Sequence, residues 1–323
     1  MFPVDILSRT KDLQSSQPNV QLRLTRVGIR NLKFNIHVFD NGKSYSLFPT
    51  IDLLVDLPSN EKGVHLSRNI ESLHEVLQEQ LKPRIHHIED FCGVVARRLL
   101  EKHKYARTAE VRFRSDYVVS RRPPMEKNFS DEPCEILATA TATRKGSDVV
   151  TDKVIGVRVV GVTACPCTQE LLKALSEERL RKAGYRKSDI KKIMSNVPVA
   201  THSQRTYGTV LVEAPDGYPV DIDDLIAILE ESMSGQTYSL LKRPSEAAIV
   251  EGAHKRTRFI EDVVREILCR LAKKYRNFPD KVHVFANAYS EESIHKHDVA
   301  AERATTLGEI RSEIKKQELR ICE

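Results

Sequence analysis

The chain has 323 residues, of which 40% are hydrophobic and 30% charged, so it can form one large or two smaller globular domains. It contains no run of about 18 apolar residues and no basic-then-apolar start, so we expect a cytoplasmic protein without a membrane partner. The net charge of +6 permits a nucleic-acid partner or a polyphosphorylated small molecule. Because Trp is absent and aromatic residues make up only 6%, we expect no nucleic-acid partner.

Hydrophobic periodicity predicts strands and helices in alternation along the first half of the chain. The clearest signals are an Asn41-Gly42 turn typical of a hairpin, and a helix with apolar residues at helical spacing. Ser67 or Asn69 is the expected cap of the first helix. The expected elements are strands within 21–39, a strand at 51–57, a helix after residue 66, a helix at about 84–104, and strands at 109–120 and 135–143.

The second half repeats this order. Ile88-Glu89-Asp90 recurs as Ile260-Glu261-Asp262, an offset of 172 residues, and at the same offset Arg98 matches Arg270. Chance similarity between two amphipathic helices is the alternative explanation. Because the order helix, turn, strand is kept in both copies, we favour an internal duplication. The expected elements are strands within 135–163 and at 207–214 and 281–287, and helices at 221–233 and 257–275.

A duplication predicts an α+β chain of two similar modules, each with an antiparallel sheet and helices on one face. The second module is interrupted by an insertion with two charged, amphipathic segments, 169–183 and 187–196. The expected domains are a polar N-terminal lead-in (1–20), a first module (21–124), a linker (125–133), a second module (134–310, insertion 169–198) and a polar C-terminal tail (311–323).

Cys165 and Cys167 stand one residue apart at the end of a predicted strand, separated by Pro166. They are small buried residues, a redox pair, or part of a metal site. No thioredoxin-like βαβ pattern surrounds them, and no second cysteine pair gives a zinc-finger spacing. A metal site here must therefore draw ligands from distant segments and leave room for water, which suits catalysis better than structure.

Further candidate ligands lie downstream. His202 sits in a polar loop, where a single histidine is more often solvated than ligating. Glu292 and His295 share a face if their segment is helical, whereas His295 and His297 share one if it is extended; a solvated loop is the alternative. The segment Lys242-Arg243-Pro244-Ser245-Glu246 is either a surface charge run or a phosphate clamp beside a ligand.

Taken together, these motifs resemble the type IB GTP cyclohydrolases, most closely the archaeal branch that feeds methanopterin and related pterin synthesis. The resemblance spans about residues 20–305. Six short motifs in the same order carry it: Gly63-Val-His-Leu-Ser-Arg68, Thr163-Ala-Cys-Pro-Cys167, His202-Ser-Gln-Arg205, Lys242-Arg-Pro-Ser-Glu246, Phe259-Ile-Glu-Asp262 and Glu292-Ser-Ile-His-Lys-His297.

The resemblance implies the tunnelling fold in both modules and a hydrolase that opens the imidazole ring of GTP at C8. Formate would be released, and 7,8-dihydroneopterin 2′,3′-cyclic phosphate would form with loss of pyrophosphate. By matching position, the resemblance implies metal ligands Cys165, His202, Glu246 and His295, catalytic roles for Cys165, Glu292 and His295, and further candidates Cys167 and His297. It implies that Glu261 reads the guanine, while Lys242, Arg243 and Arg205 could hold the triphosphate.

The chain departs from the bacterial members of that family, which continue Cys-Pro-Cys-Ser-Lys and reach the histidine after a shorter gap. Here Thr168-Gln169 follows, and His202 comes 37 positions after Cys165, which we interpret as an archaeal-type insertion. Thiolate, imidazole and carboxylate suit Fe²⁺, Zn²⁺ or Mn²⁺. The resemblance favours Fe²⁺, with one metal per subunit.

Two other functions fit the same residues. One is another tunnelling-fold enzyme acting on pterins or purines through a nucleophilic cysteine, which needs no metal. The other is a metal- or RNA-binding protein without turnover. Because exposed sheet edges are a liability that closure between subunits removes, we also expect a dimer or tetramer with active sites where subunits meet.

Overall fold

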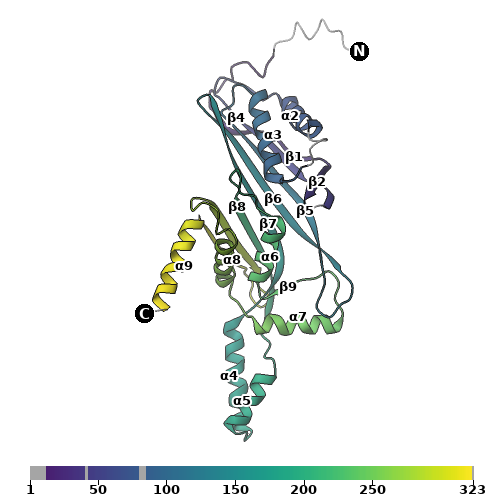
Figure 1. Cartoon of the computed structure of the whole chain (residues 1–323), viewed down its shortest axis with the longest axis vertical. Coiled ribbons are helices and arrows are strands. Elements are labelled where there is room, and N and C mark those ends of the chain that lie inside the picture. The colour runs from purple at the N-terminus through teal and green to yellow at the C-terminus, as the bar shows by residue number, and fades with distance from the viewer. Residues whose placement is uncertain (1–11, 41–42, 80–84, 322–323) are drawn as a thin grey trace. The chain divides into compact units, whose positions relative to one another are not determined.

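A computed structural model describes residues 12–40, 43–79 and 85–321 (Figure 1). The chain divides into two compact units. The first contains the described residues up to Ser115 together with Leu137–Ile155, and the second contains Asp116–Ile136 and the described residues from Gly156 onward. Three long strands, β5 (Thr108–Arg121), β6 (Ser130–Lys145) and β7 (Asp148–Ala164), each contribute one part to either unit.

The first unit is a sheet in the order β1-β4-β5-β6-β7, with helices packed on it. Strand β4 pairs antiparallel with both of its neighbours. It is buried along almost its whole length, and Ile51 and Leu53 are fully inaccessible. The remaining elements of this unit are β1 (Leu24–Lys33), the hairpin β2 (Ile36–Asp40) and β3 (Lys43–Leu47), β4 (Thr50–Leu57), α2 (Leu66–Glu79) and α3 (Ile88–Lys102).

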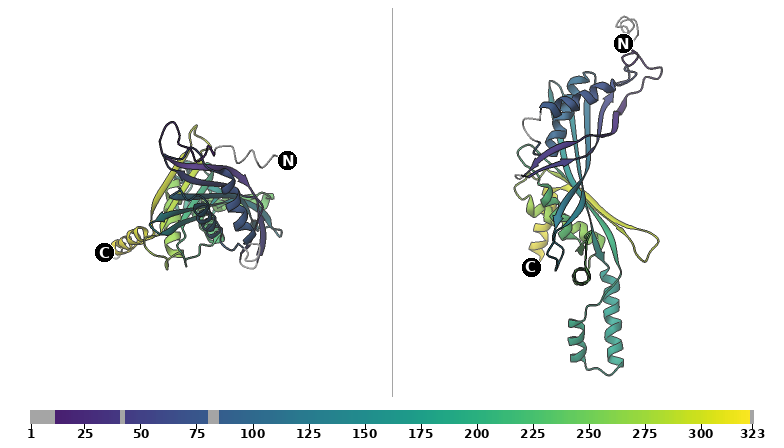
Figure 2. Two further views of the ribbon diagram at one scale, coloured as in Figure 1. Left: turned by 90° about the horizontal axis from the view of Figure 1, so that it is seen from above. Right: turned by 90° about the vertical axis from the view of Figure 1, so that its right-hand side faces the viewer.

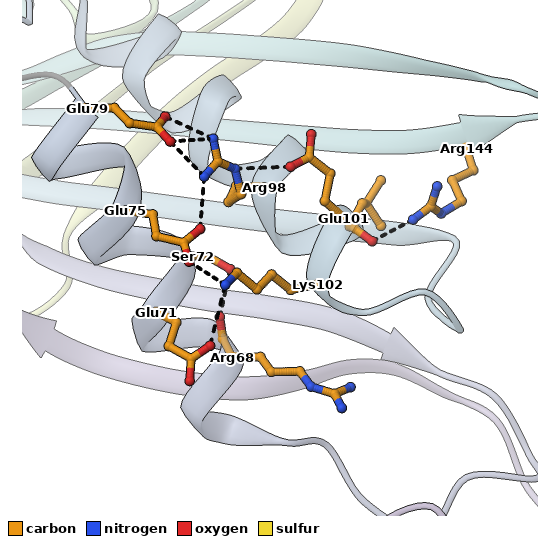
Figure 3. A network of polar contacts seen from close by, with 10 residues as sticks. Arg68, Glu71, Ser72, Glu75, Glu79, Arg98, Glu101, Lys102 and Arg144 are labelled. Atoms are coloured by element: carbon orange, nitrogen blue, oxygen red, sulfur yellow. Dashed lines mark hydrogen bonds and ion pairs between the residues drawn. The ribbon is translucent and has the colours of Figure 1, made fainter.

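Salt bridges join α2 to α3 on the solvent side of the first unit (Figure 3). The Arg98 guanidinium of α3 donates to Glu75 at 2.9 Å and to both carboxylate oxygens of Glu79, at 3.0 and 2.9 Å. One turn later, Lys102 binds Glu71 and Glu75. These ion pairs link the two helices along their exposed sides, although exposed pairs contribute little to stability.

The second unit is a sheet in the order β5-β6-β7-β8-β10-β11, and the short strand β9 pairs with β7. In Figures 1 and 2, α4 and α5 form a hairpin that projects away from the rest of this unit. Its further elements are α4 (Pro166–Lys182), α5 (Lys187–Asn196), β8 (Ser203–Glu213), α6 (Ile222–Ser232), β9 (Gly235–Gln236), α7 (Arg243–Lys255), α8 (Ile260–Lys274), β10 (His283–Glu291), β11 (Val299–Thr306) and α9 (Leu307–Ile321).

Two glycines let the end of α6 approach the sheet of the second unit closely. A Cβ at Gly161 of β7 would lie 2.2 Å from the Met233 sulfur, and one at Gly208 of β8 would lie 2.7 Å from the Met233 methyl group. Both distances are too short for any side chain, and Met233 itself is fully buried. Met233, at the end of α6, therefore packs directly on the neighbouring strands β7 and β8, a few residues from Cys165 and His202.

The two units repeat each other in burial as well as in sequence. Phe91, Val95 and Leu99 of α3 are buried, and so are the residues 172 positions later, which are Val263, Ile267 and Leu271 of α8. Arg270, the counterpart of Arg98, likewise binds a carboxylate on another helix of its unit, Glu231 of α6. The same positions thus do the same work in both copies, as a duplication requires.

The predicted α+β class with antiparallel sheets is confirmed. Among the described residues, no helix is long and apolar enough to span a membrane. The five described cysteines carry free thiols. The predicted 41–42 turn lies outside the described residues, although the strands on either side of it pair as a hairpin.

Some local expectations differ from the structure. Helix α2 begins at Leu66, so neither Ser67 nor Asn69 caps it. Asn69 instead points inward and donates to the Leu53 carbonyl at 2.9 Å. Strand β6 begins at Ser130, inside the expected 125–133 linker, while α7, β11 and α9 were not expected as elements.

A buried polar network in the first unit includes His103, which follows α3 and has no solvent-exposed surface. Its Nε2 contacts the Asn69 side-chain oxygen and its Nδ1 contacts the Tyr105 hydroxyl, each at 2.9 Å. Burial, helped by the charges of Arg68 and His65, lowers the pKa of His103 from 6.5 to about 4. The folded protein therefore holds this imidazole neutral.

We expect this histidine to make the protein less stable in acid. Between pH 6.5 and about 4 the unfolded chain binds a proton that the folded chain does not, so stability falls as the pH drops through that window. The full loss is on the order of 3 kcal/mol. His103→Gln should lower stability at pH 7 but lack this part of the pH dependence. Urea unfolding of both proteins at several pH values measures the free energy of unfolding. An identical dependence of that free energy on pH in the two proteins would contradict a neutral, buried His103.

Candidate functional site

Cys165 lies where β7 ends and α4 begins, as the N-cap residue with an extended backbone (φ −71°, ψ 117°). Pro166 at the first helical position favours that start. The Cys165 N–H donates to the His202 carbonyl at 3.1 Å, and the preceding Ala164 carbonyl accepts from the Arg258 N–H at 3.1 Å. Three segments far apart in sequence therefore meet at this strand end.

His202 precedes β8 and is half-buried. Its Nδ1 is inaccessible and has no hydrogen-bond partner among the described residues. The His202 ring lies 6.3 Å from that of His295, in the β10–β11 loop, and His295 stacks on His297 with ring centroids 5.1 Å apart. The structure thus brings these three imidazoles together, and the backbone of His202 contacts that of Cys165.

The donor types at this place fit a borderline divalent metal. A thiol and imidazoles are present, and one buried imidazole nitrogen lacks the partner that a buried polar atom normally has. Within the described part of the chain, however, no three or more His, Cys, Asp or Glu side chains are already drawn together to hold an ion. The four-residue ligand set therefore stays a prediction.

The other predicted residues around the site differ in their surroundings. Glu292 is half-buried and accepts from the Ser290 hydroxyl at 2.9 Å. Cys167 is exposed. Glu246 is exposed on the first turn of α7.

The Lys242–Glu246 segment forms the start of α7, where Lys242 is the N-cap residue. The buried Ser245 donates to the Glu126 carboxylate at 2.8 Å, and the exposed Lys242 lies 3.6 Å from the same carboxylate. The predicted phosphate clamp is therefore anchored through Glu126 to the loop before β6, which leaves Arg243 and Glu246 exposed.

Glu261 and its counterpart Glu89 occupy the same helical position in different surroundings. Glu89, at the start of α3, is only 3% exposed, and burial raises its pKa. Glu261, in the first turn of α8, is exposed. A carboxylate near a helix N-terminus is favoured by the helix dipole in both places. Only Glu261 is open to a ligand.

A cavity of about 340 Å³ in the second unit has Arg205 in its wall, next to Tyr207 on β8. That volume lies in the range of about 300–1,000 Å³ that is usual for small-molecule sites. Glu230 also lines it, and burial raises the pKa of that carboxyl, although Arg121 binds it at 3.1 Å. Arg205 is the predicted substrate residue that the structure places in this cavity.

A second polar cluster joins α4 to α7. The Gln169 side-chain amide donates to the Val199 carbonyl at 2.8 Å and to the His254 carbonyl at 2.7 Å. The His254 ring in turn contacts two carbonyls, that of Val250 through Nδ1 at 2.7 Å and that of Thr201 through Nε2 at 3.0 Å. The segment 199–201, which leads directly into His202, is thus held from two sides.

Sequence reasoning missed Gln169, His254, Glu230 and Arg121 as parts of these arrangements. Gln169 was only noted as a departure from the bacterial pattern. His254 lies in a weakly amphipathic helix with no motif around it, and its partner Gln169 is 85 residues away. The acidic first turn of α6 gave no sign that Glu230, near the other end of that helix, would be half-buried and paired with Arg121.

The sequence matches the family described as Type I GTP cyclohydrolase folE2 over residues 10–301. Among curated relatives, GTP cyclohydrolase MptA from Methanococcus aeolicus is 42% identical over 94% of this chain and 99% of its own length. The enzyme of that name from Methanocaldococcus jannaschii is 39% identical over 94% and 97%, respectively.

Among solved structures, the chain is similar to a uricase from Bacillus fastidious, with a TM-score of 0.49, 9% identity and coverage of 90% of this chain and 96% of that one. So distant a similarity says nothing about the activity of this chain. The full-length match to the family and to the archaeal relatives is of another order, and it shows that the chain belongs to the type I GTP cyclohydrolase family, in its MptA branch.

Proposed function

We propose that this protein is a metal-dependent GTP cyclohydrolase that opens the imidazole ring of guanine at C8 and releases formate. The product would be 7,8-dihydroneopterin 2′,3′-cyclic phosphate, formed with loss of pyrophosphate early in pterin synthesis for methanopterin. The observation that carries the proposal lies at the end of β7. The Cys165 N–H donates to the carbonyl of His202, whose buried Nδ1 has no partner among the described residues, and the His295 ring lies beside that of His202.

Cys165, His202, His295 and Glu246 would hold the metal, with Fe²⁺ favoured and Zn²⁺ or Mn²⁺ also suited to such donors. When bound, the metal would activate water for attack at C8, which is a poor electrophile. Glu246 would approach from the first turn of α7, where it is exposed and unconstrained by burial.

Other residues would bind the nucleotide and move protons. Glu261 is exposed at a helix N-terminus, where its carboxylate can accept hydrogen bonds from both N1–H and the 2-amino group of guanine. Arg205, Lys242 and Arg243 would bind the triphosphate, for which Arg offers bidentate hydrogen bonds. His295, whose ring lies 6.3 Å from that of His202, and Glu292 would take and return protons as the ring opens.

The reaction itself is tested by anaerobic incubation of the metal-loaded protein with GTP. Formate and a cyclic phosphate of dihydroneopterin should appear together in equal amounts. Turnover by metal-free protein that is blocked by a thiol alkylator would instead favour a nucleophilic cysteine. Absence of any turnover with Fe²⁺, Zn²⁺ and Mn²⁺ would contradict the proposal.

Cys165→Ala should abolish both metal binding and turnover while leaving the fold intact, because a methyl group cannot replace a thiolate ligand. Cys167→Ala is the matched control. It should be milder, because Cys167 is exposed and two ligands linked through one proline rarely fit a single tetrahedral ion. Elemental analysis with circular dichroism measures both effects. A full metal complement in Cys165→Ala would remove that thiol from the site.

Glu261→Gln and Glu89→Gln compare the two copies of one motif. Glu261→Gln replaces one acceptor by a donor, so GTP turnover should fall by about two orders of magnitude while metal content and melting temperature stay nearly unchanged. Glu89→Gln should leave the kinetics close to those of the parent protein. Steady-state kinetics of both variants decide this. Equal losses would mean that Glu261 only stabilises its helix.

We also propose assembly into a dimer or tetramer with active sites between subunits. Strand β1 ends the sheet order of the first unit and β11 that of the second, and both strands have many exposed residues. Paired with another chain, such edges would no longer offer open backbone groups. Sedimentation of the metal-loaded protein should give a dimer or tetramer. An active, stable monomer would rule this assembly out.

A further inference from the structure

The three segments that carry Cys165, His202 and Glu246 are joined to one another by hydrogen bonds of neighbouring residues. Gln169 follows Cys165 by one helical turn on α4, Thr201 directly precedes His202, and His254 lies on α7, two turns beyond Glu246. Gln169, Thr201 and His254 belong to one connected set of hydrogen bonds. We call Gln169, His254 and the backbone of 199–201 the junction.

The two side chains of the junction are buried, and they contact four backbone carbonyls. Gln169 is 6% exposed and His254 is 9% exposed. Gln169 uses its side-chain amide to bind one carbonyl from each of two segments, Val199 and His254. Both nitrogens of the His254 ring face carbonyl oxygens, Nδ1 that of Val250 and Nε2 that of Thr201.

Gln169 is the one buried residue of α4, whose other side chains are exposed or half-buried. A helix usually anchors itself through an apolar stripe, whereas here Leu171, Leu172 and Leu175 are exposed. The amide of Gln169 therefore fixes the first turn of α4, and with it the position of Cys165, against α7 and the segment before His202.

We propose that Gln169 and His254 are positioning residues for the metal site, because they set the relative placement of the segments that bear Cys165, His202 and Glu246. Residues that orient metal ligands commonly tune affinity as strongly as some ligands do. This inference rests on the proposed function, since it needs a metal at those residues. It adds two residues that would never touch the metal or GTP.

The test is the affinity of the metal-free full-length protein for Zn²⁺, measured by competition with a chromogenic chelator and without GTP. Gln169→Leu keeps the side-chain size but removes both N–H donors, and His254→Phe removes both ring nitrogens. Each should raise the Kd for Zn²⁺ by about 10- to 100-fold. Circular dichroism and thermal melting show whether each variant is folded.

The first unit supplies matched controls. Asn69 and His103 are also a buried amide and a buried imidazole that share hydrogen bonds, yet they lie outside the proposed site. Asn69→Leu and His103→Phe should destabilise the protein and leave the Kd for Zn²⁺ within about twofold of the parent value, since residues with no shared partners act independently.

Unchanged affinity in Gln169→Leu and His254→Phe would overturn the inference, and so would equal losses in the two control variants. Should His254→Phe fail to fold, His254→Gln replaces it. Because His254→Gln keeps one donor group, we expect it to lose less affinity for Zn²⁺ than Gln169→Leu does. Failure of the metal site itself gives a different result, because the parent protein would then bind no Zn²⁺ or Cys165→Ala would bind it equally well.

Discussion

The hydrogen bond from the Cys165 N–H to the His202 carbonyl is the contact on which the candidate site depends. It continues the pairing of the adjacent strands β7 and β8 just beyond the end of the sheet. Just inside it, the buried hydroxyls of Thr163 and Thr206 share a hydrogen bond of 2.8 Å. Because Met233 packs directly on both strands, the strand ends that carry the thiol and the imidazole are held in place.

This pairing of β7 and β8 explains how the chain can carry the insertion between Cys165 and His202. Helices α4 and α5 leave the sheet at the first residue and return at the second, so their length need not alter the distance between the strand ends (Figure 1). The insertion attaches a long helical hairpin directly to Cys165. The buried Gln169 in the first turn of α4 restrains this hairpin, while most of the other residues of α4 stay exposed.

The two copies share one framework but differ at the start of the corresponding helices. The pairing of Arg98 and of Arg270 with carboxylates on a neighbouring helix is kept in both. At the helix starts the copies diverge, because Glu89 is buried while Glu261 is exposed. A buried carboxylate prefers to be neutral, whereas an exposed one stays charged and can bind a ligand.

Much of the framework could be predicted from sequence because its elements are strongly periodic. Helices α3 and α8 and strand β4 have long buried stripes, which local patterns reveal. Helix α7 could not be predicted, since few of its residues are buried and Pro244 looks like a breaker although it occupies the first turn. The cap expected at Asn69 was wrong because a tertiary partner, the Leu53 carbonyl, draws that side chain inward.

The site divides in the same way between what local motifs reveal and what they do not. Short motifs pointed to Cys165, His202 and His295, which the structure brings together. Contacts such as that of Gln169 with His254 join residues 85 positions apart and leave no local pattern. A polar residue at one buried helix position is indistinguishable, in sequence, from one at a solvated position.

Exposure across the site indicates how it would become active. Cys165 and His202 are half-buried, but Glu246, Glu261 and His295 are exposed in the single chain. Charged groups stabilise a transition state most effectively where water is excluded. In the proposed site, part of that exclusion would come from bound GTP or from the second subunit proposed above. The exposed residues of the outer strand β11, which shares a hairpin with His295, fit the proposed contact with a second subunit.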